Sequence, residues 1–313
     1  MSSQFRIPFD QATRSDAMYL IERGLTEDVG NHDLSRAVDC TTDSLFPESA
    51  PATAALVSRE SGIVCGVQVC QLAVERFTNN LELRIEVGDS KPIETGQTIA
   101  TLAGNAREIL MLERTCLNFL CRLSAISSLT QLFVARVQGT NACILDTRKT
   151  TPGWRRLEKY AVQCGGGKNH RMGLHDAVMI KDNHLAAQAK LVSENQLSIP
   201  EAINLSRDWI NANVDSLPHG RQTILQIEVD TLKQLEIALP CGPDIILLDN
   251  MSPADLERSV QLRDQLNPRV LLEASGGVNL KTVQTIAETG VERISVGGLT
   301  HSAGNFDIGL DWG

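Results

Sequence analysis

Positive charge is concentrated in one stretch of an otherwise acidic chain. Residues 148–181 contain eight Lys and Arg against two Asp and Glu, a net +6, whereas the whole 313-residue chain carries −9. Clustered like charges disfavour the folded state through self-repulsion unless an anion neutralises them. The stretch therefore predicts a site for a small polyanion, and phosphates and carboxylates are the anions that Arg and Lys bind well.

Three groups of side chains in this stretch are expected to converge on the anion: Arg148 with Lys149, Lys168 with His170 and Arg171, and Lys181. A neutral His170 ring between these cations could donate one hydrogen bond to the anion, although a lone histidine is more simply explained as a structural residue. The other cations, Arg155, Arg156 and Lys159, share a predicted helix with Glu158, and we interpret them as a solvated helix face.

Two carboxylates, Glu228 and Asp249, end later apolar runs and oppose these cations. Hard oxygen ligands beside phosphates suit Mg²⁺, which takes one or two carboxylates and completes its shell with water and phosphate oxygens. A salt bridge from each carboxylate to the basic cluster explains them equally well. For Asp146 and Asp182, pairing with neighbouring cations is the favoured interpretation.

Glycine-rich loops follow the last two apolar runs. They contain Ser275, Gly276 and Gly277, and then Gly297 and Gly298. Backbone N–H groups in such loops bind phosphate, but glycine after a strand can also mark an ordinary turn. Two such loops in succession favour the phosphate site.

Beyond residue 140 the chain repeats one unit, an apolar run with a polar end followed by a helical stretch. Helices are predicted over 154–163, 200–212, 253–265 and 280–288. The apolar runs are ACILDTRK, AVMIKDNH, TILQIEVD, DIILLDN, RVLLEASGG and RISVGG. This alternation predicts a parallel sheet buried on both faces.

Polar residues end every predicted strand, and no GxGxxG motif follows a first strand, so an α/β barrel is favoured over a doubly wound sheet. In such a barrel the active site lies at the carboxyl ends of the strands. The six clear strands do not support an eight-stranded closed barrel, so an open or incomplete barrel is expected.

The first third of the chain predicts a separate α/β unit. Residues 15–25 have apolar side chains at helical spacing, and 81–87 alternate apolar and charged residues as a half-buried strand does. After Pro51, a short strand precedes an apolar stretch that becomes helical.

Residues 105–137 contain no Pro or Gly and predict one long helix. Arg114 and Arg122 interrupt its apolar surface. Each could snorkel to solvent or pair with a carboxylate such as Glu113; for Arg122 this is the favoured interpretation, and Arg114 stays open.

Composition excludes several classes of protein. Hydrophobic residues make up 42% and charged residues 21%, as in a globular chain with a sizeable core. The acidic balance argues against a nucleic-acid or anionic-membrane partner, and no apolar run approaches the roughly 18 residues of a membrane span. The N-terminus lacks a signal-peptide pattern and the eight Cys form no CxxC pair, so we expect a cytoplasmic protein with reduced thiols.

The chain resembles the quinolinate phosphoribosyltransferase family, also called nicotinate-nucleotide pyrophosphorylase. The long match DTRKTTPGWRRLEKYAVQCGGGKNHRMGLHDAVMIKDNH (146–184) carries the resemblance. The motifs EDVGNHDLS, ERTCLN, EVD, LLDN, EASGG and ISVGGLTHS fit in family order and extend it over nearly the whole chain. Departures are slight: Trp154 where Leu is usual, Ala125 where Gly is frequent, and His32 where Gly is common.

The resemblance implies an N-terminal α/β sandwich (1–116), an open α/β barrel (117–298) and a C-terminal segment (299–313) that returns toward the N-terminal domain. It implies a Mg²⁺-dependent glycosyltransferase of NAD biosynthesis that converts quinolinate and phosphoribosyl pyrophosphate into nicotinate mononucleotide, pyrophosphate and CO₂. A homodimer or higher homo-oligomer is expected, in which Arg114 enters the partner's site.

Motif matching also implies roles for individual residues. Arg148, Lys149, His170, Arg171 and Lys181 resemble the substrate-carboxylate and phosphate binders, and Glu228 and Asp249 resemble the residues at the Mg²⁺ and ribose end. Ser275, Gly276, Gly277, Gly297 and Gly298 belong to the loops for the 5′-phosphate. Lys149, Lys181, Glu228 and Asp249 are expected to serve catalysis. Two alternative functions remain. One is a related phosphoribosyltransferase with another substrate, either nicotinate or the substrate of a molybdate-associated pyrophosphorylase-like protein. The other is a non-catalytic protein that binds a phosphate ligand.

Overall fold

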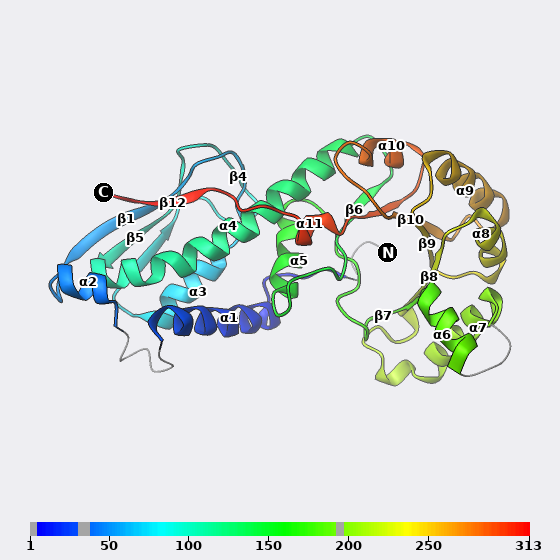
Figure 1. Cartoon of the computed structure of the whole chain (residues 1–313), viewed down its shortest axis with the longest axis horizontal. Coiled ribbons are helices and arrows are strands. Elements are labelled where there is room, and N and C mark those ends of the chain that lie inside the picture. Colours follow the sequence, from blue (N-terminus) through cyan, green and yellow to red (C-terminus); the bar gives the residue numbers. More distant parts are fainter. Residues whose placement is uncertain (1–4, 31–37, 192–196) are drawn as a thin grey trace.

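A computed structural model describes residues 5–30, 38–191 and 197–313. His32 and most of the EDVGNHDLS motif lie outside the described residues. An N-terminal sheet with its helices and a barrel-like ring of strands lie at opposite ends of the molecule (Figure 1), and one long helix joins them. The α/β fold class predicted from the sequence is confirmed.

The N-terminal sheet is antiparallel, with strand order β12-β1-β5-β3. Its strands are β1 (Pro51–Ser58), β3 (Glu82–Ile85), β5 (Thr98–Asn105) and β12 (Ile308–Trp312), and a small pair is formed by β2 (Gly62–Ile63) and β4 (Pro92–Ile93). The helices of this part are α1 (Gln11–Val29), α2 (Cys40–Leu45) and α3 (Val67–Phe77). Since β12 pairs with β1, the end of the chain returns from the barrel to the first sheet.

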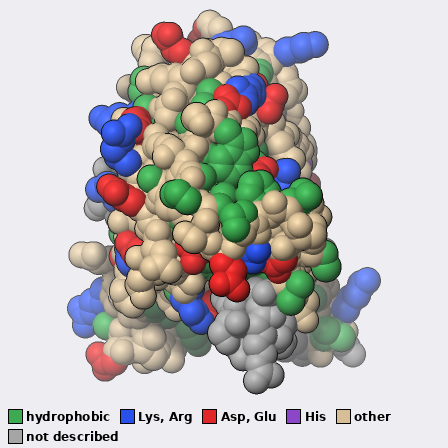
Figure 2. All heavy atoms as spheres, turned by 90° about the vertical axis from the view of Figure 1, so that its left-hand side faces the viewer, with side chains coloured by type: hydrophobic (Ala, Val, Ile, Leu, Met, Phe, Trp, Pro, Cys, Tyr) green, Lys and Arg blue, Asp and Glu red, His purple; other side chains and the backbone are tan. Residues whose placement is uncertain are grey.

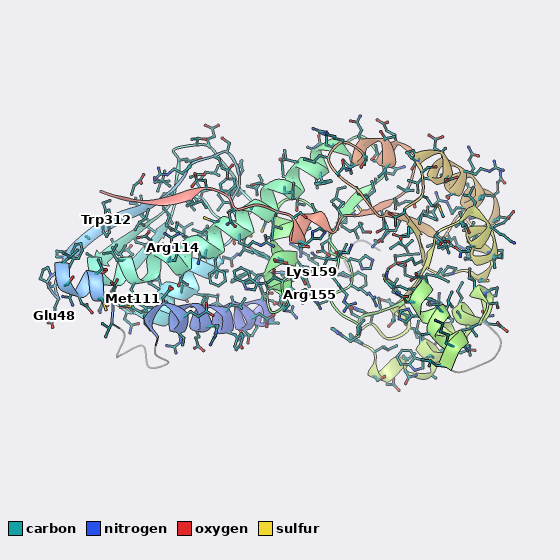
Figure 3. All side chains as sticks on the ribbon, in the orientation of Figure 1. Glu48, Met111, Arg114, Arg155, Lys159 and Trp312 are labelled. Carbon is teal, nitrogen blue, oxygen red and sulfur yellow. The ribbon has the colours of Figure 1, made fainter. Side chains whose placement is uncertain are left out.

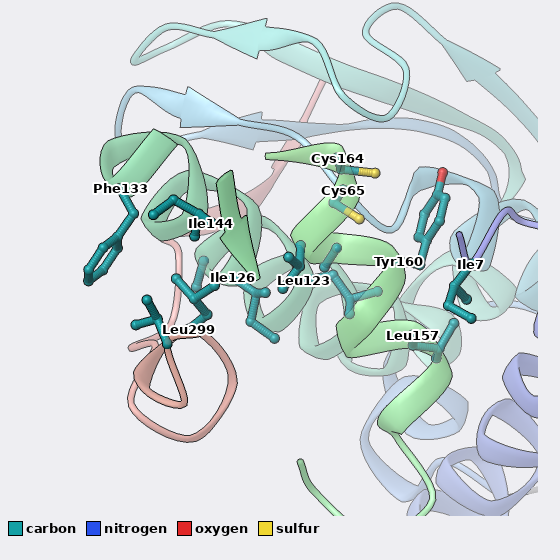
Figure 4. Packing of buried hydrophobic residues seen from close by; sticks show 14 of the residues in the cluster. Ile7, Cys65, Leu123, Ile126, Phe133, Ile144, Leu157, Tyr160, Cys164 and Leu299 are labelled. Carbon is teal, nitrogen blue, oxygen red and sulfur yellow. The ribbon is translucent and has the colours of Figure 1, made fainter. Parts of the chain in front are cut away.

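Helix α4 (Ala106–Arg136) confirms the predicted long helix and crosses the expected domain boundary after residue 116. Asn105 caps it by accepting a hydrogen bond from Arg107 N–H. Leu123 and Ile126 of α4 pack against Leu157 and Ile144 of the barrel half (Figure 4). By length and composition α4 could cross a membrane, but 56% of its most apolar window is buried inside the molecule, as in a core helix.

The second sheet contains six parallel strands in the order β6-β11-β10-β9-β8-β7. They are β6 (Cys143–Leu145), β7 (Ala177–Ile180), β8 (Ile224–Val229), β9 (Ile245–Asp249), β10 (Leu271–Ser275) and β11 (Arg293–Ser295). The α-helices here are α5 (Arg155–Cys164), α6 (Asp182–Leu191), α7 (Ile199–Ala212), α8 (Leu232–Ala238), α9 (Pro253–Leu266), α10 (Val283–Glu288) and α11 (Gly298–His301). Short 3₁₀ turns occupy Val214–Ser216, Gly220–Gln222 and Leu239–Cys241.

The sheet is open between its outer strands β6 and β7. On the β6 side, Lys168 forms a bridge with Leu145. The N-terminal residues then cross this side, because Ile7 N–H donates to Asn169 Oδ1 over 3.1 Å and Phe5 packs in a small cluster with residues of β7 and β8. The open barrel expected from six strands is thus what the chain forms.

One expectation for individual cations is wrong, and one is confirmed. The α5 face is not solvated, since Lys159 is fully buried and Arg155 and Arg156 are half-buried. Arg122 does pair with a carboxylate, but its partner is the buried Glu158 at 2.8 Å and not Glu113. Lys159 pairs with Asp146, which follows β6, and Arg122 of α4 pairs with Glu158 of α5. Charge spacing along a single helix reveals neither pair.

Candidate active site

The carboxyl ends of the six strands bring most predicted site residues to one rim. Lys181 follows β7, Glu228 lies near the end of β8, and Asp249 and Ser275 are cross-strand partners at the ends of β9 and β10. Lys149 and Gly297 follow β6 and β11, which are paired. Parallel strands end at the same edge, so these side chains share one surface.

Lys181 and Glu228 form an ion pair at this rim. The Glu228 side chain is 13% exposed and that of Lys181 is 39% exposed, so the lysine is the accessible partner. Asp249 accepts a hydrogen bond of 2.8 Å from its neighbour Asn250. The salt bridge considered as an equal alternative to a metal site is therefore present for Glu228, while Asp249 has no cation within ion-pair distance among the described residues.

The loop after β10 is shaped around Gly276. Its φ is +93°, and an added Cβ would lie 2.1 Å from Asn250 Oδ1 and 2.9 Å from Asn250 N. Within the described residues the N–H groups of Gly276, Gly277 and Gly297 have no acceptor in hydrogen bonds outside regular elements. Free N–H groups beside cations are suited to phosphate oxygens.

Gly276→Ala is expected to weaken binding of a phosphate ligand at least tenfold, because the methyl group would push the loop away from Asn250 and strain a left-handed residue. Calorimetric titration with a phosphorylated ligand measures this. Gly304→Ala, where nothing lies within 4 Å of the new Cβ, is the matched control. Equal affinity in both variants would contradict a role for this loop.

His301 was not selected from the sequence but lies at the second glycine-rich loop. An added Cβ at Gly297 would be 3.0 Å from Lys149 Cδ and 3.2 Å from His301 Nε2. The Thr300 hydroxyl donates to Lys149 O over 2.7 Å and holds the β6 and β11 loops together. The ISVGGLTHS motif contained this histidine, but spacing alone gave no reason to choose it.

Arg148 and Arg171 are close enough for their positive charges to interact. Burial lowers the pKa of Arg171, and the neighbouring positive charge of Arg148 lowers it further, with partial relief from Asp176. Arg171 is buried and donates to Ala177 O over 3.2 Å, whereas Arg148 is exposed. Two guanidinium groups this close are stabilised by an anion between them.

A buried ion pair between Lys159 and Asp146 lies beneath this cationic group, and both side chains are fully buried. The Lys159 ammonium donates to His170 O over 2.9 Å, and Asp146 accepts from His170 N–H over 2.8 Å. The pair thus fixes both polar groups of the His170 backbone. Burial raises the pKa of Asp146, and Lys159 with the surrounding donors offsets part of this effect.

The His170 ring faces the protein interior. Arg171 N–H donates to Nδ1 over 2.8 Å, so the ring proton is assigned to Nε2, which lies 3.2 Å from Glu273 Oε1. That contact lacks hydrogen-bond alignment, since Glu273 Oε1 has no hydrogen-bond partner, while Oε2 accepts from Arg293 over 2.8 Å. Burial opposes ionisation of Glu273, but His170 and Arg293 hold its pKa well below its usual range.

Two predicted residues lie away from the rim. Lys168 bridges Leu145, the last residue of β6, but it also lines a cavity with the first residues of several strands, so the predicted cluster with His170 and Arg171 is divided. Arg114 lies on α4 in the N-terminal half (Figure 3). It is 66% exposed, and within the described part of the chain its carboxylate contact is Glu113 at 3.9 Å.

Family models match the chain along most of its length. The model described as quinolinate phosphoribosyl transferase, N-terminal domain, matches residues 39–124, and that for the C-terminal domain matches residues 126–311. A nicotinate-nucleotide pyrophosphorylase (carboxylating) of Mycobacterium leprae is 40% identical over 90% of this chain and 93% of the relative. A probable enzyme of that name from Bacillus subtilis is 36% identical over 93% of this chain and 92% of the relative.

The architecture agrees with a solved relative. The nicotinate-nucleotide pyrophosphorylase structure from Francisella tularensis superposes with a TM-score of 0.83 at 31% identity, covering 98% of both chains. The first matched domain covers β1 to β5 of the N-terminal sheet, and the second covers the open barrel and most of β12, which returns to that sheet. The chain therefore belongs to the quinolinate phosphoribosyl transferase family.

Proposed function

We propose that the strand-end rim catalyses transfer of a phosphoribosyl group from phosphoribosyl pyrophosphate to quinolinate, with loss of CO₂, in NAD biosynthesis. The observation that carries this proposal is the pair of neighbouring guanidinium groups, Arg148 and Arg171: burial lowers the pKa of Arg171, and the positive charge of Arg148 lowers it further. A substrate with two carboxylates relieves that repulsion. Lys149 lies beside this pair, and the His170 backbone is held in place below it.

The two glycine loops suit the phosphate end of the second substrate. Gly276, Gly277 and Gly297 offer free N–H groups, with Ser275 and Gly298 beside them. Lys149 and Lys181 supply positive charge for the pyrophosphate that leaves. Preorganised donors of this kind contribute typically about 10²- to 10³-fold to a rate each.

Mg²⁺ fits the residues at the ends of β8 and β9. Glu228 and Asp249 supply two hard oxygen ligands on neighbouring strands, and the described residues contain no group of three His, Cys, Asp or Glu that would enclose a metal. This donor set is typical of Mg²⁺ that reaches a site with a phosphate substrate. When bound, the ion would offset the charge of the pyrophosphate.

The chain's residues hold the reactants, and the pyridine nitrogen is the nucleophile. Its lone pair forms the bond to the anomeric carbon while the bond to the pyrophosphate oxygen breaks, through an oxocarbenium-like transition state. The quaternised nitrogen then accepts electron density as the adjacent carboxylate leaves as CO₂ and a proton takes its place. Burial and the Arg148–Arg171 pair orient quinolinate for the first of these steps.

Product analysis tests this function directly. Incubation with phosphoribosyl pyrophosphate and either quinolinate or nicotinate is expected to give nicotinate mononucleotide from quinolinate, with one CO₂ and one pyrophosphate per product. Product from nicotinate alone would favour the related transferase, and binding of both substrates without product would favour a non-catalytic protein.

Arg148→Ala is expected to weaken quinolinate binding by about 1.5–3 kcal/mol, roughly 10- to 100-fold, because it removes a charged hydrogen-bond donor. Arg148 is exposed, so the fold is expected to persist. Calorimetric titration measures the affinity, with Arg258→Ala, an exposed arginine on α9, as the control. Equal losses of quinolinate affinity in the two variants would contradict a role for Arg148 in the site.

Asp249→Asn is expected to lower turnover and to raise the Mg²⁺ concentration needed for half-maximal rate, with quinolinate affinity nearly unchanged. The reason is that the amide keeps the size of the side chain but loses the charge that attracts the ion. Initial rates over a Mg²⁺ series decide the matter, and a response identical to that of the parent protein would contradict the metal role.

A homodimer with Arg114 shared between subunits explains the position of this residue. Arg114 lies in the N-terminal half, so within one chain it is distant from the rim (Figure 3). Apolar side chains gather on the outer face of the N-terminal sheet and its helices (Figure 2). The exposed apolar residues of this half include Leu45 of α2, which is 71% exposed, and Trp312, which is 48% exposed. A partner subunit packed there would bury them. All eight cysteines are free, which agrees with a cytoplasmic location.

A further inference from the structure

A cavity of about 600 Å³ opens at the amino ends of the barrel strands. Its wall includes the first residues of four strands: Cys143, Ile224, Leu271 and Arg293. The cavity therefore lies at the opposite end of the barrel from the rim that carries the proposed activity. Its volume is within the usual range of roughly 300–1,000 Å³ for sites that hold small molecules.

The cavity is lined by four cations and a single acid, although the chain as a whole is acidic. The acid, Glu292, is already bound, because it accepts from Arg263 over 2.6 Å and from Leu272 N–H over 2.9 Å. Among the cations, Arg293 is paired with Glu273 at 2.8 Å. The negative charge of Glu292 is thus already neutralised by an ion pair and a hydrogen bond within the fold.

The remaining three cations are Arg6, Lys168 and Arg269. Each is exposed, and none has a carboxylate within ion-pair distance in the part of the chain that the structure describes. Lys168 and Arg293 act on the same wall residue: burial raises the pKa of the Cys143 thiol, and the two positive charges lower it. The charge of Lys168, which has no acidic partner among the described residues, therefore acts on the cavity wall.

The backbone fixes the side chains at this end of the barrel. Lys168 N–H donates to Ile144 O over 2.8 Å and Asp146 N–H donates to Lys168 O over 3.2 Å, so Lys168 is tied to β6 at both of its backbone groups. Arg269 precedes β10 by two residues. Phe5 and Leu271 add apolar surface, and Asn141, Gln163 and Asn169 add amide groups.

We propose that this cavity binds a small anion of two or more negative charges, a phosphate ester or a compound with several carboxylates. Cations that converge without acidic partners repel one another, and a multiply charged anion removes that cost. Arg and Lys bind both oxyanions, and the apolar and amide surface accommodates the rest of a small molecule. The site is separate from the proposed reaction and does not depend on it.

Titration calorimetry with inorganic phosphate and with citrate tests the proposal on the full-length protein at low salt. Lys168→Gln/Arg269→Gln is expected to weaken one binding event at least about tenfold, since two charged contacts are lost. Lys149→Gln, at the rim, is expected to leave that event intact. Arg258→Gln/Lys281→Gln, which removes two exposed cations elsewhere, is the matched control.

Each outcome decides a part of the proposal. Binding of phosphate alone identifies phosphate esters as the ligand class, binding of citrate alone identifies polycarboxylates, and binding of both shows that the site selects charge. The proposal is overturned if neither anion binds the parent protein, or if the Lys168→Gln/Arg269→Gln variant titrates as its control does. Thermal unfolding without anions checks that all variants are folded.

Discussion

Lys159→Met is expected to lower the free energy of unfolding by about 3–5 kcal/mol, a large share of the stability of a typical domain. The substitution keeps the length of a fully buried side chain but leaves the Asp146 carboxylate without its cation. Breaking one partner of a buried ion pair costs this much because the remaining charge stays out of water. Denaturant unfolding of the purified protein measures the change.

The loss is expected to depend on pH in a definite direction. Burial already raises the pKa of Asp146 above its ordinary 3.8, and removal of Lys159 takes away the main opposing interaction. A carboxyl group whose folded pKa is raised destabilises the protein once the pH exceeds its unfolded pKa. The deficit of Lys159→Met against the parent is therefore smallest near pH 4 and grows toward neutral pH.

Two further variants separate the ion pair from simple loss of packing. Asp146→Asn combined with Lys159→Met removes the uncompensated charge, so the double variant is expected to be more stable than Lys159→Met alone. Arg156 lies on the same helix as Lys159 and forms a partly exposed ion pair with Asp16 of α1. Arg156→Met breaks this pair and is expected to cost less than about 1 kcal/mol of unfolding free energy. Equal costs for Lys159→Met and Arg156→Met would contradict the central role of the buried pair.

The fold was predictable because its signals are local. Each parallel strand reads as a short apolar run, and each is followed by a residue such as Lys181 or Ser275 that the carboxyl end of a strand presents to solvent. The long helix α4 was predictable because no Gly or Pro interrupts it. The order of strands and polar residues along the chain was therefore enough to predict both the sheet and the rim.

What the sequence did not reveal depends on contacts between distant residues. Lys159 looks like a surface lysine of helix α5 until Asp146, the residue after β6, is placed against it. Lys168 is two residues from His170, yet the two residues face different surroundings. Lys168 lines the cavity with the first residues of several strands, whereas the His170 ring lies against the buried Glu273. His301 was missed because its neighbour Lys149 is far away in the chain.

Mixing Arg114→Ala protein with Lys181→Ala protein, each inactive alone, is expected to restore activity to about a quarter of the parental level. Random exchange of subunits makes about half of the dimers mixed, and in a mixed dimer one site carries both lesions while the other carries neither. The structure motivates the test, because Arg114 is exposed on α4 and Lys181 lies at the end of β7.

Recovery of activity would separate a shared site from a site within one chain. If Arg114 served its own subunit, every mixed dimer would contain two damaged sites, and no activity would return. Exchange must be shown independently, by mass spectrometry of differently tagged chains, so that absence of recovery is informative. Lys149→Ala mixed with Lys181→Ala is the control: both residues belong to one rim, so this pair is expected to stay inactive under the same exchange. Recovery in the first mixture alone places Arg114 in the partner's site.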